Sequence, residues 1–385
     1  MRRNNRVRVV CLLLLLSFLP SPPLSTAAAL PAEKGSATIR SRIVFVGDIL
    51  IHPEQLAAAE RNGEWDFSPS FRKVRHLFAD AIAVANLETV LAGARAGFSG
   101  RPPFNAPDAL ASTLVEAGID VVTLANNHIR DRGAAGALRT ADILDRAGIR
   151  PLGLTGENGA AAAPLFLERD GIRWAFVNFN DVGGEEEGER PFPVEHPAAC
   201  SATETAVATA LRAACAASPD IVAACFHWGA EYRTDPTPRQ RKLAAFAVAH
   251  GADMVIGTHP HVLQPIEMTT SARGPALVAY SLGNFLSHQR KPPRERSVIL
   301  AVDVEKSDGQ TRISRVSVAP VRVAAFRRGA YRVEIVPAGE GSGIVPPANR
   351  DETPAEIRDA VLAFLGAERS ADRDGFYRLQ SFRGR

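Results

Sequence analysis

The sequence predicts an α/β fold with two central sheets and helices on their outer faces. Three observations lead to this prediction. Continuous apolar runs recur between residues 42 and 261, and such runs are typical of strands that are buried on both faces. Helix-like stretches separate the runs, as crossover connections between parallel strands do. From residue 276 onward, strand-like runs follow one another with short turns between them, which indicates antiparallel pairing.

Strands and helices are expected to alternate along the first two thirds of the chain. Strands are expected at residues 42–47, 81–88, 119–125, 149–154, 163–168, 172–180, 220–229 and 252–261. Helices are expected at residues 53–61, 107–117, 133–148, 202–217 and 236–250, and Gly148 is a typical helix stop. Residues 181–199 are acidic and rich in Pro and Gly, which predicts a surface loop near the site.

The last third of the chain is expected to consist mainly of strands, at residues 276–285, 297–306, 313–323 and 331–338. A short final helix is expected at residues 353–365. The domain should therefore span residues 41–340, and residues 341–385 should form a peripheral C-terminal tail that contains this helix.

The first 29 residues have the pattern of a secretory signal peptide. Four arginines within the first eight residues precede the apolar run VVCLLLLLSFL, and an A-x-A cleavage site lies near Ala27–Ala29. The apolar run has about a dozen residues, whereas a membrane span needs roughly 20. We therefore expect an exported protein, in the periplasm or outside the cell, with residues 30–40 as a linker. An uncleaved signal that anchors the protein to the membrane is the alternative.

Composition excludes several classes of function. The formal net charge is +3, but without the four arginines of residues 1–29 the chain has 45 − 4 = 41 basic and 42 acidic residues. A nucleic-acid partner is therefore not expected. The chain has no P-loop, no G-x-G-x-x-G before a helix and no G-x-S-x-G, so nucleotide cofactors and serine-hydrolase chemistry have no support.

The cysteines of the mature chain are not expected to form a disulfide. Cys200 and Cys215 flank a helix-like stretch of 14 residues, which would be roughly 21 Å long. A disulfide requires about 4.4–6.8 Å between Cα atoms. We therefore expect free, mostly buried thiols.

Polar side chains able to bind a metal ion follow the ends of the buried runs. In an open α/β sheet these ends form one rim at which ligands bind. Taken singly, Asp48 could be a turn or helix-cap residue, Asn127 a turn residue and His227 a core histidine. However, six of the nine histidines lie in these segments or directly behind them, at positions 52, 128, 227, 259, 261 and 288. Mixed His, carboxylate and Asn donors suit Mn, Fe, Zn or Ni, so we expect one or two divalent metal ions.

Two short motifs at this rim give more specific expectations. In the H-P-H motif at residues 259–261, alternation would place both imidazoles on one face if the segment is extended, and Pro260 excludes a helix. Asp131 is expected to cap the helix that starts near Gly133, with a catalytic role as the alternative.

Six motifs in this order resemble the CapA family of bacterial capsule and poly-γ-glutamate synthesis proteins. They are GD (47–48), NLE (86–88), NNHxxDxG (126–133), HWGxEY (227–232), GxHPHVxQPIE (257–267) and SLGNF (281–285). The family resembles a branch of the calcineurin-like metallophosphoesterase superfamily. The resemblance therefore implies a four-layer α-β-β-α sandwich, in which two mixed sheets are flanked by helices and a metal site lies on the rim.

The resemblance also implies roles for individual residues. Asp48 and His261 would bind one metal ion, Asn127, His227 and His259 would bind the other, and Glu88 would lie between the two. His128 would be the general acid. Further candidates for the site are His52, Asn126, Trp228, Glu231 and Asn284.

Two positions depart from the usual pattern of the superfamily. A D-x-H motif is usual at the first position, whereas here three residues separate Asp48 from His52, and Glu88 stands where an aspartate is usual. A site with one metal ion, or without catalysis, therefore stays open.

We expect an exported protein that takes part in the synthesis, tethering or export of an anionic capsule polymer such as poly-γ-glutamate. Its expected partners are the polymer and membrane-bound polymer synthesis proteins. The first alternative is a metal-dependent phosphoesterase that acts on a phosphorylated envelope substrate. The second is a binding module with a relict site.

Overall fold

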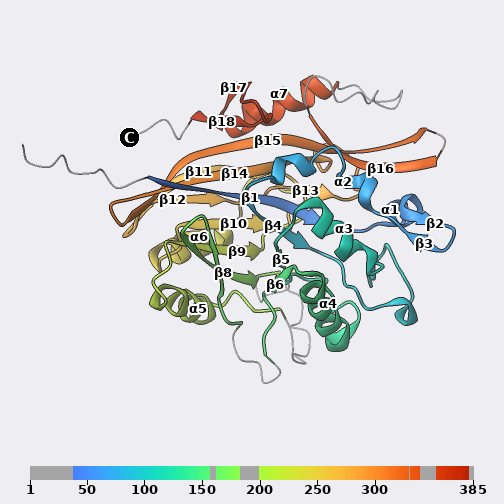
Figure 1. Cartoon of the computed structure of the whole chain (residues 1–385), viewed down its shortest axis with the longest axis horizontal. Coiled ribbons are helices and arrows are strands. Elements are labelled where there is room, and N and C mark those ends of the chain that lie inside the picture. Colours follow the sequence, from blue (N-terminus) through green and yellow to red (C-terminus); the bar gives the residue numbers. More distant parts are fainter. Residues whose placement is uncertain (1–37, 157–161, 183–198, 329, 339–352, 381–385) are drawn as a thin grey trace, which may run out of the picture. The chain divides into compact units, whose positions relative to one another are not determined.

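In the computed structural model, the first predicted strand of the domain forms the centre of a large mixed sheet (Figure 1). The strand β1 (Ile39–Ile49) pairs in parallel with β4 on one side and antiparallel with β14 on the other. Beyond β4 the sheet continues with β5 and β6, and beyond β14 it continues with β15, β18 and β17, while β13 pairs with β1 and β16 pairs with β15. The bounds are β4 (Ile82–Leu87), β5 (Val121–Thr123), β6 (Arg150–Leu152), β13 (Asn284–Leu286), β14 (Arg296–Ser307), β15 (Gln310–Arg328), β16 (Ala330–Pro337), β17 (Ala367–Ala371) and β18 (Tyr377–Leu379).

The structure describes residues 38–156, 162–182, 199–328, 330–338 and 353–380. The expected signal peptide, residues 30–37 of the expected linker and most of the expected acidic loop lie outside these ranges, whereas residues 39 and 40 of that linker belong to β1. Residues Ala37–Arg385 form one unit. Among the described residues, no helix has both the length and the apolar character that a membrane crossing requires.

The second sheet is built from the middle of the chain. Its strands β8, β9, β10 and β12 are parallel, and the two edge strands β7 and β11 pair antiparallel to their neighbours. The bounds are β7 (Leu165–Arg169), β8 (Ile172–Asn180), β9 (Ile221–His227), β10 (Met254–Thr258), β11 (Ile266–Ser271) and β12 (Gly274–Ala279).

Helices cover the outer face of each sheet, as Figure 1 shows. On the first sheet these are α1 (Pro53–Ala59), α2 (Ser68–Phe71), α3 (Ala109–Ala117) and α4 (Gly133–Ala147), and on the second α5 (Glu204–Ala216) and α6 (Pro238–Ala249). Successive β1 residues show the layering, because Val44 joins the core under α3 and α4 whereas Ile43 joins the core between the sheets. The predicted four-layer sandwich of two mixed sheets is therefore confirmed.

Local signals set the ends of the helices. Thr237 accepts the backbone N–H of Gln240, whose side chain in turn accepts the N–H of Thr237, and Pro238 occupies the first turn of α6. This reciprocal cap satisfies two donors that would otherwise lack a partner. Gly148 ends α4 with a positive φ of 96°, a conformation that glycine adopts without steric cost.

The C-terminal part differs from the expectation. The helix α7 (Pro354–Leu365) is present, but residues after it belong to the first sheet: β17 (Ala367–Ala371) pairs with β18 (Tyr377–Leu379), which pairs with β15. The side chains of Leu365 and Leu379 enter the core between the two sheets. The tail is therefore partly structural rather than peripheral.

Smaller elements complete the described chain. The strand β11 was not expected from the sequence, and neither was the pair of β2 (Glu60–Arg61) and β3 (Glu64–Trp65). Two 3-10 helices, η1 (Arg75–Phe78) and η2 (Ala94–Ala96), lie in connections. Cys200, Cys215 and Cys225 are free, as predicted.

Candidate metal centre

Strands of both sheets deliver polar side chains to one locus. The first sheet contributes from the carboxyl ends of β1, β4 and β5, and the second sheet contributes from those of β9 and β10. Such ends are where ligands bind in α/β folds. The six side chains predicted as metal ligands are all found here: Asp48, Glu88, Asn127, His227, His259 and His261.

One group of candidate ligating atoms is centred on His227. Its Nε2 lies 3.0 Å from Oδ1 of Asn127 and 3.5 Å from Oε1 of Glu88. Glu88, His227 and His259 each offer an atom, and these atoms all lie within 4.8 Å of one another. The group contains the three residues expected for one metal ion, together with Glu88.

A second group is centred on His261. Its Nδ1 lies 3.1 Å from Oδ2 of Asp48, and its Nε2 lies 3.7 Å from Oε1 of Glu88. The ligating atoms of Asp48, Glu88 and His261 again all lie within 4.8 Å of one another. Glu88 is thus shared by the two groups, which is the position expected for it.

The donor set fits a cation. Glu88 is 0% exposed, and neither of its carboxylate oxygens has a hydrogen-bond partner; the same holds for Nδ1 of the buried His259. Burying a carboxylate without hydrogen bonds is costly unless a cation or other partner compensates. The three histidines, with carboxylate and amide oxygens, are ligands that suit divalent transition metals.

Thr258 orients His227 in a way that fits this role. Nδ1 of His227 lies 3.2 Å from the hydroxyl oxygen of Thr258, which itself donates to the carbonyl of Phe226, and 3.4 Å from Nδ2 of Asn86. Nε2 of His227 faces the oxygens of Asn127 and Glu88. Polar partners that hold the second ring nitrogen of a metal-binding histidine are a usual feature of metal sites.

Electrostatics differ between the histidines of the H-P-H motif. Burial and the charges of His227 and His261 hold the pKa of His259 well below its usual value, so this imidazole is neutral. For His261, burial lowers the pKa, but the charges of Glu88 and Asp48 outweigh burial and raise it to about 9. Burial would raise the pKa of Asp48, yet its hydrogen bond with His261 and the nearby histidine charges lower it overall.

The backbone of the H-P-H motif is not extended, so this part of the sequence argument is wrong. Strand β10 ends at Thr258, and His259 and His261 have positive φ angles of 96° and 58°. Positive φ is uncommon for residues other than glycine. The turn is held by a hydrogen bond from the N–H of Tyr232 to the carbonyl of Pro260, at 2.7 Å. Both imidazoles still face the site, with ring centroids 5.8 Å apart.

Asp131 does not cap α4, which is a second correction. The N-cap residue of that helix is Arg132, without a side-chain cap. The carboxylate of Asp131 instead accepts the N–H of Phe104 at 2.5 Å and lies 3.1 Å from Nδ1 of His128. The ring of Phe104 packs edge-on against His128, with centroids 4.8 Å apart. Asp131 therefore orients His128 and leaves its Nε2 available.

Two further candidates hold the site in place, and a third belongs to the core. Asn126 is buried and accepts the N–H of His128, while its amide donates to the carbonyl of Leu87. Asn284 is buried beside Asp48 in the strand register, and its amide donates to the carbonyl of His261 at 3.2 Å. Trp228 is a core residue, because its indole N–H donates to the carbonyl of Tyr280 and its ring stacks on Phe226 in the core outside the second sheet.

The other two candidates lie at the margin. His52 belongs to neither ligand group among the described residues; it occupies the N-cap of α1, and burial lowers its pKa to about 4. Of Asp48 and His52, the two residues that were compared with the D-x-H motif, only Asp48 therefore lies in a group of candidate ligands. Glu231 is exposed, and its charge helps to raise the pKa of His261.

Two supporting residues were not among the predicted site residues. Asn86 donates to Oδ1 of Asp48 at 2.8 Å, and Thr258 orients His227. Asn86 lies two positions before Glu88 and Thr258 lies directly before His259. Asn86 stands in the NLE motif and Thr258 is the last residue of β10. Both lie at the end of a buried strand, so the rule that pointed to the candidate ligands points to them as well.

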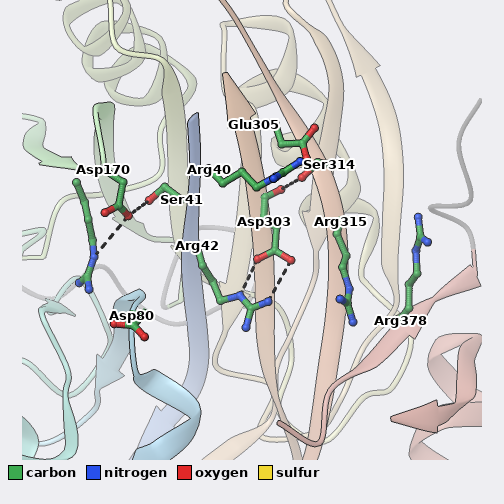
Figure 2. Close-up of a pocket in the computed structure, with 11 residues that line it drawn as sticks. Arg40, Ser41, Arg42, Asp80, Asp170, Asp303, Glu305, Ser314, Arg315 and Arg378 are labelled. Carbon is green, nitrogen blue, oxygen red and sulfur yellow. Dashed lines mark hydrogen bonds and ion pairs between the residues drawn. The ribbon is translucent and has the colours of Figure 1, made fainter. Parts of the chain in front are cut away.

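A hollow at the other end of β1 does not belong to this site (Figure 2). Its volume is about 630 Å³, and Arg40, Arg42, Asp303 and Glu305 are among its lining residues. The arginines are already paired: Arg42 Nε lies 2.6 Å from Asp303 and Arg40 Nε lies 2.9 Å from Glu305. Arg42 and Asp48 are separated by roughly 20 Å of extended chain. We interpret the hollow as a surface depression that is lined by paired charges, and not as a ligand site.

The fold and the site define an α/β protein with a candidate divalent-metal centre between its two sheets. Residues 42–289, more than half of the chain, match the family model of "Bacterial capsule synthesis protein PGA_cap". The chain belongs to this family.

Curated relatives agree with this assignment. The chain is 32% identical over 191 residues to "Capsule biosynthesis protein CapA" of Bacillus anthracis, covering 48% of this chain and 44% of that protein. It is 29% identical over 212 residues to "PGA biosynthesis protein CapA" of Bacillus subtilis (strain 168), covering 54% of this chain and 52% of that protein. The chain thus spans about half the length of the curated relatives it matches.

A looser likeness is found among solved structures. The calcineurin-like phosphoesterase YfkN from Bacillus subtilis matches with a TM-score of 0.45 and 11% identity, covering 85% of this chain and 97% of that chain. The family assignment rests on the sequence match.

Proposed function

We propose that the protein takes part in the synthesis, tethering or export of an anionic capsule polymer such as poly-γ-glutamate, outside the cytoplasm. Family membership supports the capsule role, and the secretory pattern of residues 1–29 supports export. The proposed partners are the polymer itself and membrane-bound proteins of polymer synthesis.

The observation that carries the role of the site is the buried carboxylate of Glu88. It lies between two groups of donors and has no hydrogen bond. In this proposal Asn127, His227 and His259 hold one divalent ion, and Asp48 and His261 hold the other. When bound, such ions neutralise an anionic group and lower the pKa of water.

The chain's own residues would position the substrate and supply a proton. His128 presents Nε2 while Nδ1 contacts Asp131, so Nε2 is the atom that would give a proton to a leaving group. Burial lowers the pKa of His128, but the hydrogen bond with Asp131 and the nearby carboxylate charges raise it overall, which favours the proton-bearing form. Asn126 fixes the backbone of His128 and so holds this imidazole beside the ligands.

This arrangement also favours the second candidate function, a metal-dependent phosphoesterase acting on a phosphorylated envelope substrate. The specific observation is the His128–Asp131 pair, because a carboxylate that orients a histidine supports proton transfer by that histidine. A protein that only binds a polymer does not need this pair.

A single preparation of the purified protein tests both proposals. Bound metal is measured by elemental analysis, for the wild type and for the double variant His259→Ala/His261→Ala. Hydrolysis is measured with generic phosphomonoesters and phosphodiesters and with poly-γ-glutamate, in the presence of each candidate metal. The same variants are expressed in a capsule-producing strain that lacks its own copy, and polymer is quantified.

The capsule role predicts that the wild type restores polymer and the double variant does not. Full metal content in the double variant would show that the ligands are misassigned. Restoration of polymer by a variant without metal would refute a role for the centre in that process. Hydrolysis of phosphoesters by the wild type, lost in the double variant, would favour the phosphoesterase.

A further inference from the structure

A basic segment borders the candidate metal centre. Residues 287–296 read SHQRKPPRER and follow β13 directly. The segment begins close to the site, because Asn284 of β13 is the register partner of Asp48. Apart from Glu295, which is buried, its charged residues are basic.

Arg294 of this segment has an unusual environment. Its guanidinium carbon lies 3.2 Å from the centroid of the Tyr232 ring, a cation–π contact. The Tyr232 ring lies 6.1 Å from the imidazole of His261. Within the described ranges, no hydrogen bond or ion pair engages the guanidinium of Arg294, and none joins it to the nearby Glu231. Its N–H donors are therefore left for a ligand.

Three hydrogen bonds fix Arg294 and Tyr232 relative to the candidate ligands. The amide of Asn284 donates to the carbonyl of Arg294 at 2.9 Å and to that of His261 at 3.2 Å. The N–H of Tyr232 donates to the carbonyl of Pro260 at 2.7 Å. The stacked pair is thus tied to the same turn that presents His259 and His261. A group held in this way before a ligand arrives loses less freedom on binding.

The chemistry of the guanidinium indicates what it would bind. Arginine forms paired, charge-assisted hydrogen bonds with carboxylates and phosphates. Arg294 contacts the ring of Tyr232 and belongs to neither group of candidate ligands, so it would contact a group next to the one at the centre. A ligand with a single anionic group, once held at the centre, has no second group for Arg294 to bind, whereas a polyanion has one.

We propose that Arg294 is a specificity residue that binds a second anionic group of the substrate, beside the group held at the candidate metal centre. The proposal rests on the function proposed above and names its substrate class: a chain with oxyanions repeated at short intervals. These oxyanions could be the carboxylates of a polyglutamate or the phosphates of a phosphorylated polymer.

The test measures binding by the full-length protein with isothermal titration calorimetry. The polyanion probes are a γ-linked glutamate hexamer and tripolyphosphate, and the probes with one anionic group are acetate and inorganic phosphate. The variants are Arg294→Gln, Arg294→Lys and, as a matched control, Arg146→Gln. Arg146 is an exposed arginine of α4 that pairs with Asp142. Metal content and thermal stability, measured for every variant, report whether the fold and the centre are retained.

We expect Arg294→Gln to lower the ratio of polyanion affinity to single-anion affinity by about tenfold or more, with Arg294→Lys recovering part of this loss and Arg146→Gln equal to the wild type. A loss confined to the glutamate hexamer would identify carboxylates, and one confined to tripolyphosphate would identify phosphates. An unchanged ratio in a folded Arg294→Gln protein, while the wild type binds a polyanion, would overturn the inference and leave the proposed function standing. Failure of the wild type to bind either polyanion would count against the polymer role itself.

Discussion

Replacing Glu88 by glutamine should remove most of the response of the protein to divalent metal. Glu88 belongs to both groups of ligating atoms, and its two oxygens have no hydrogen-bond partner. Glutamine keeps the size of the side chain but has no negative charge. The change therefore tests the role of the carboxylate charge without creating a cavity in the surrounding core.

The expected magnitude follows from linkage between binding and folding. A metal ion present at a hundredfold excess over its Kd stabilises the native state by about 2.7 kcal/mol. Loss of a residue that only supports a ligand typically weakens binding by about 10–100-fold, so loss of the shared carboxylate should cost at least a hundredfold. At the same metal concentration, about 0.4 kcal/mol of stabilisation would remain. For a unit of roughly 350 residues, the metal-induced increase in Tm should fall from about 4 °C to under 1 °C.

The assay is thermal unfolding of chelator-treated protein, with and without added Mn, Fe, Zn or Ni. A suitable control is Glu334→Gln, because Glu334 is also largely buried but pairs with Lys73 and Arg332. The control should keep the full metal response. An equal response in Glu88→Gln and in the wild type would refute the assignment of this carboxylate to the centre.

Three further predictions concern the surroundings of the site. In metal-free Asp131→Asn, the pKa of His128 should fall, because burial lowers it and the opposing carboxylate is gone; an unchanged NMR titration would contradict this. Gly47→Ala should lower the free energy of unfolding by about 1–3 kcal/mol or more, since a Cβ there would lie 1.8 Å from the carbonyl oxygen of Gly283; an unshifted urea midpoint would argue against the close approach. In chelator-treated protein, His261 has its pKa raised to about 9 despite burial, by neighbouring carboxylates. Protonation of His261 should therefore stabilise the folded protein fully below about pH 6.5, and this stabilisation should be lost as pH rises through about 9. An equal free energy of unfolding at pH 6 and at pH 10 would count against this prediction.

The central fold could be predicted because strands buried on both faces leave a direct trace in the sequence. In β1 the successive residues Ile43, Val44 and Phe45 are all buried, although they face different cores. Edge strands leave no such trace. The strand β11 is mostly exposed, and β17 consists of AERSA. Such segments pair through backbone hydrogen bonds, which composition does not reveal.

The candidate site could be predicted to the extent that it depends on topology. Parallel strands place their carboxyl ends together, so Asp48, Glu88 and His227 could be grouped without knowledge of side-chain geometry. The local backbone could not be predicted in this way. His259 and His261 adopt positive φ angles because the turn is tied to distant residues. The carboxylate of Asp131 accepts a hydrogen bond from the backbone of Phe104, 27 residues earlier. From the sequence alone, an aspartate two residues before a helix is instead predicted to cap that helix.

The division of the candidate ligands between the two sheets has a consequence for how the candidate centre is completed during folding. The first sheet contributes donors only up to Asn127, and the second sheet contributes them only from His227 onward; Asp48 and His261 meet across 213 positions of sequence. A chain that has formed only its first half carries three of the six donors. Metal capture would therefore be a late event that requires both halves of the protein to have folded and docked, and a truncated chain would be unable to complete it.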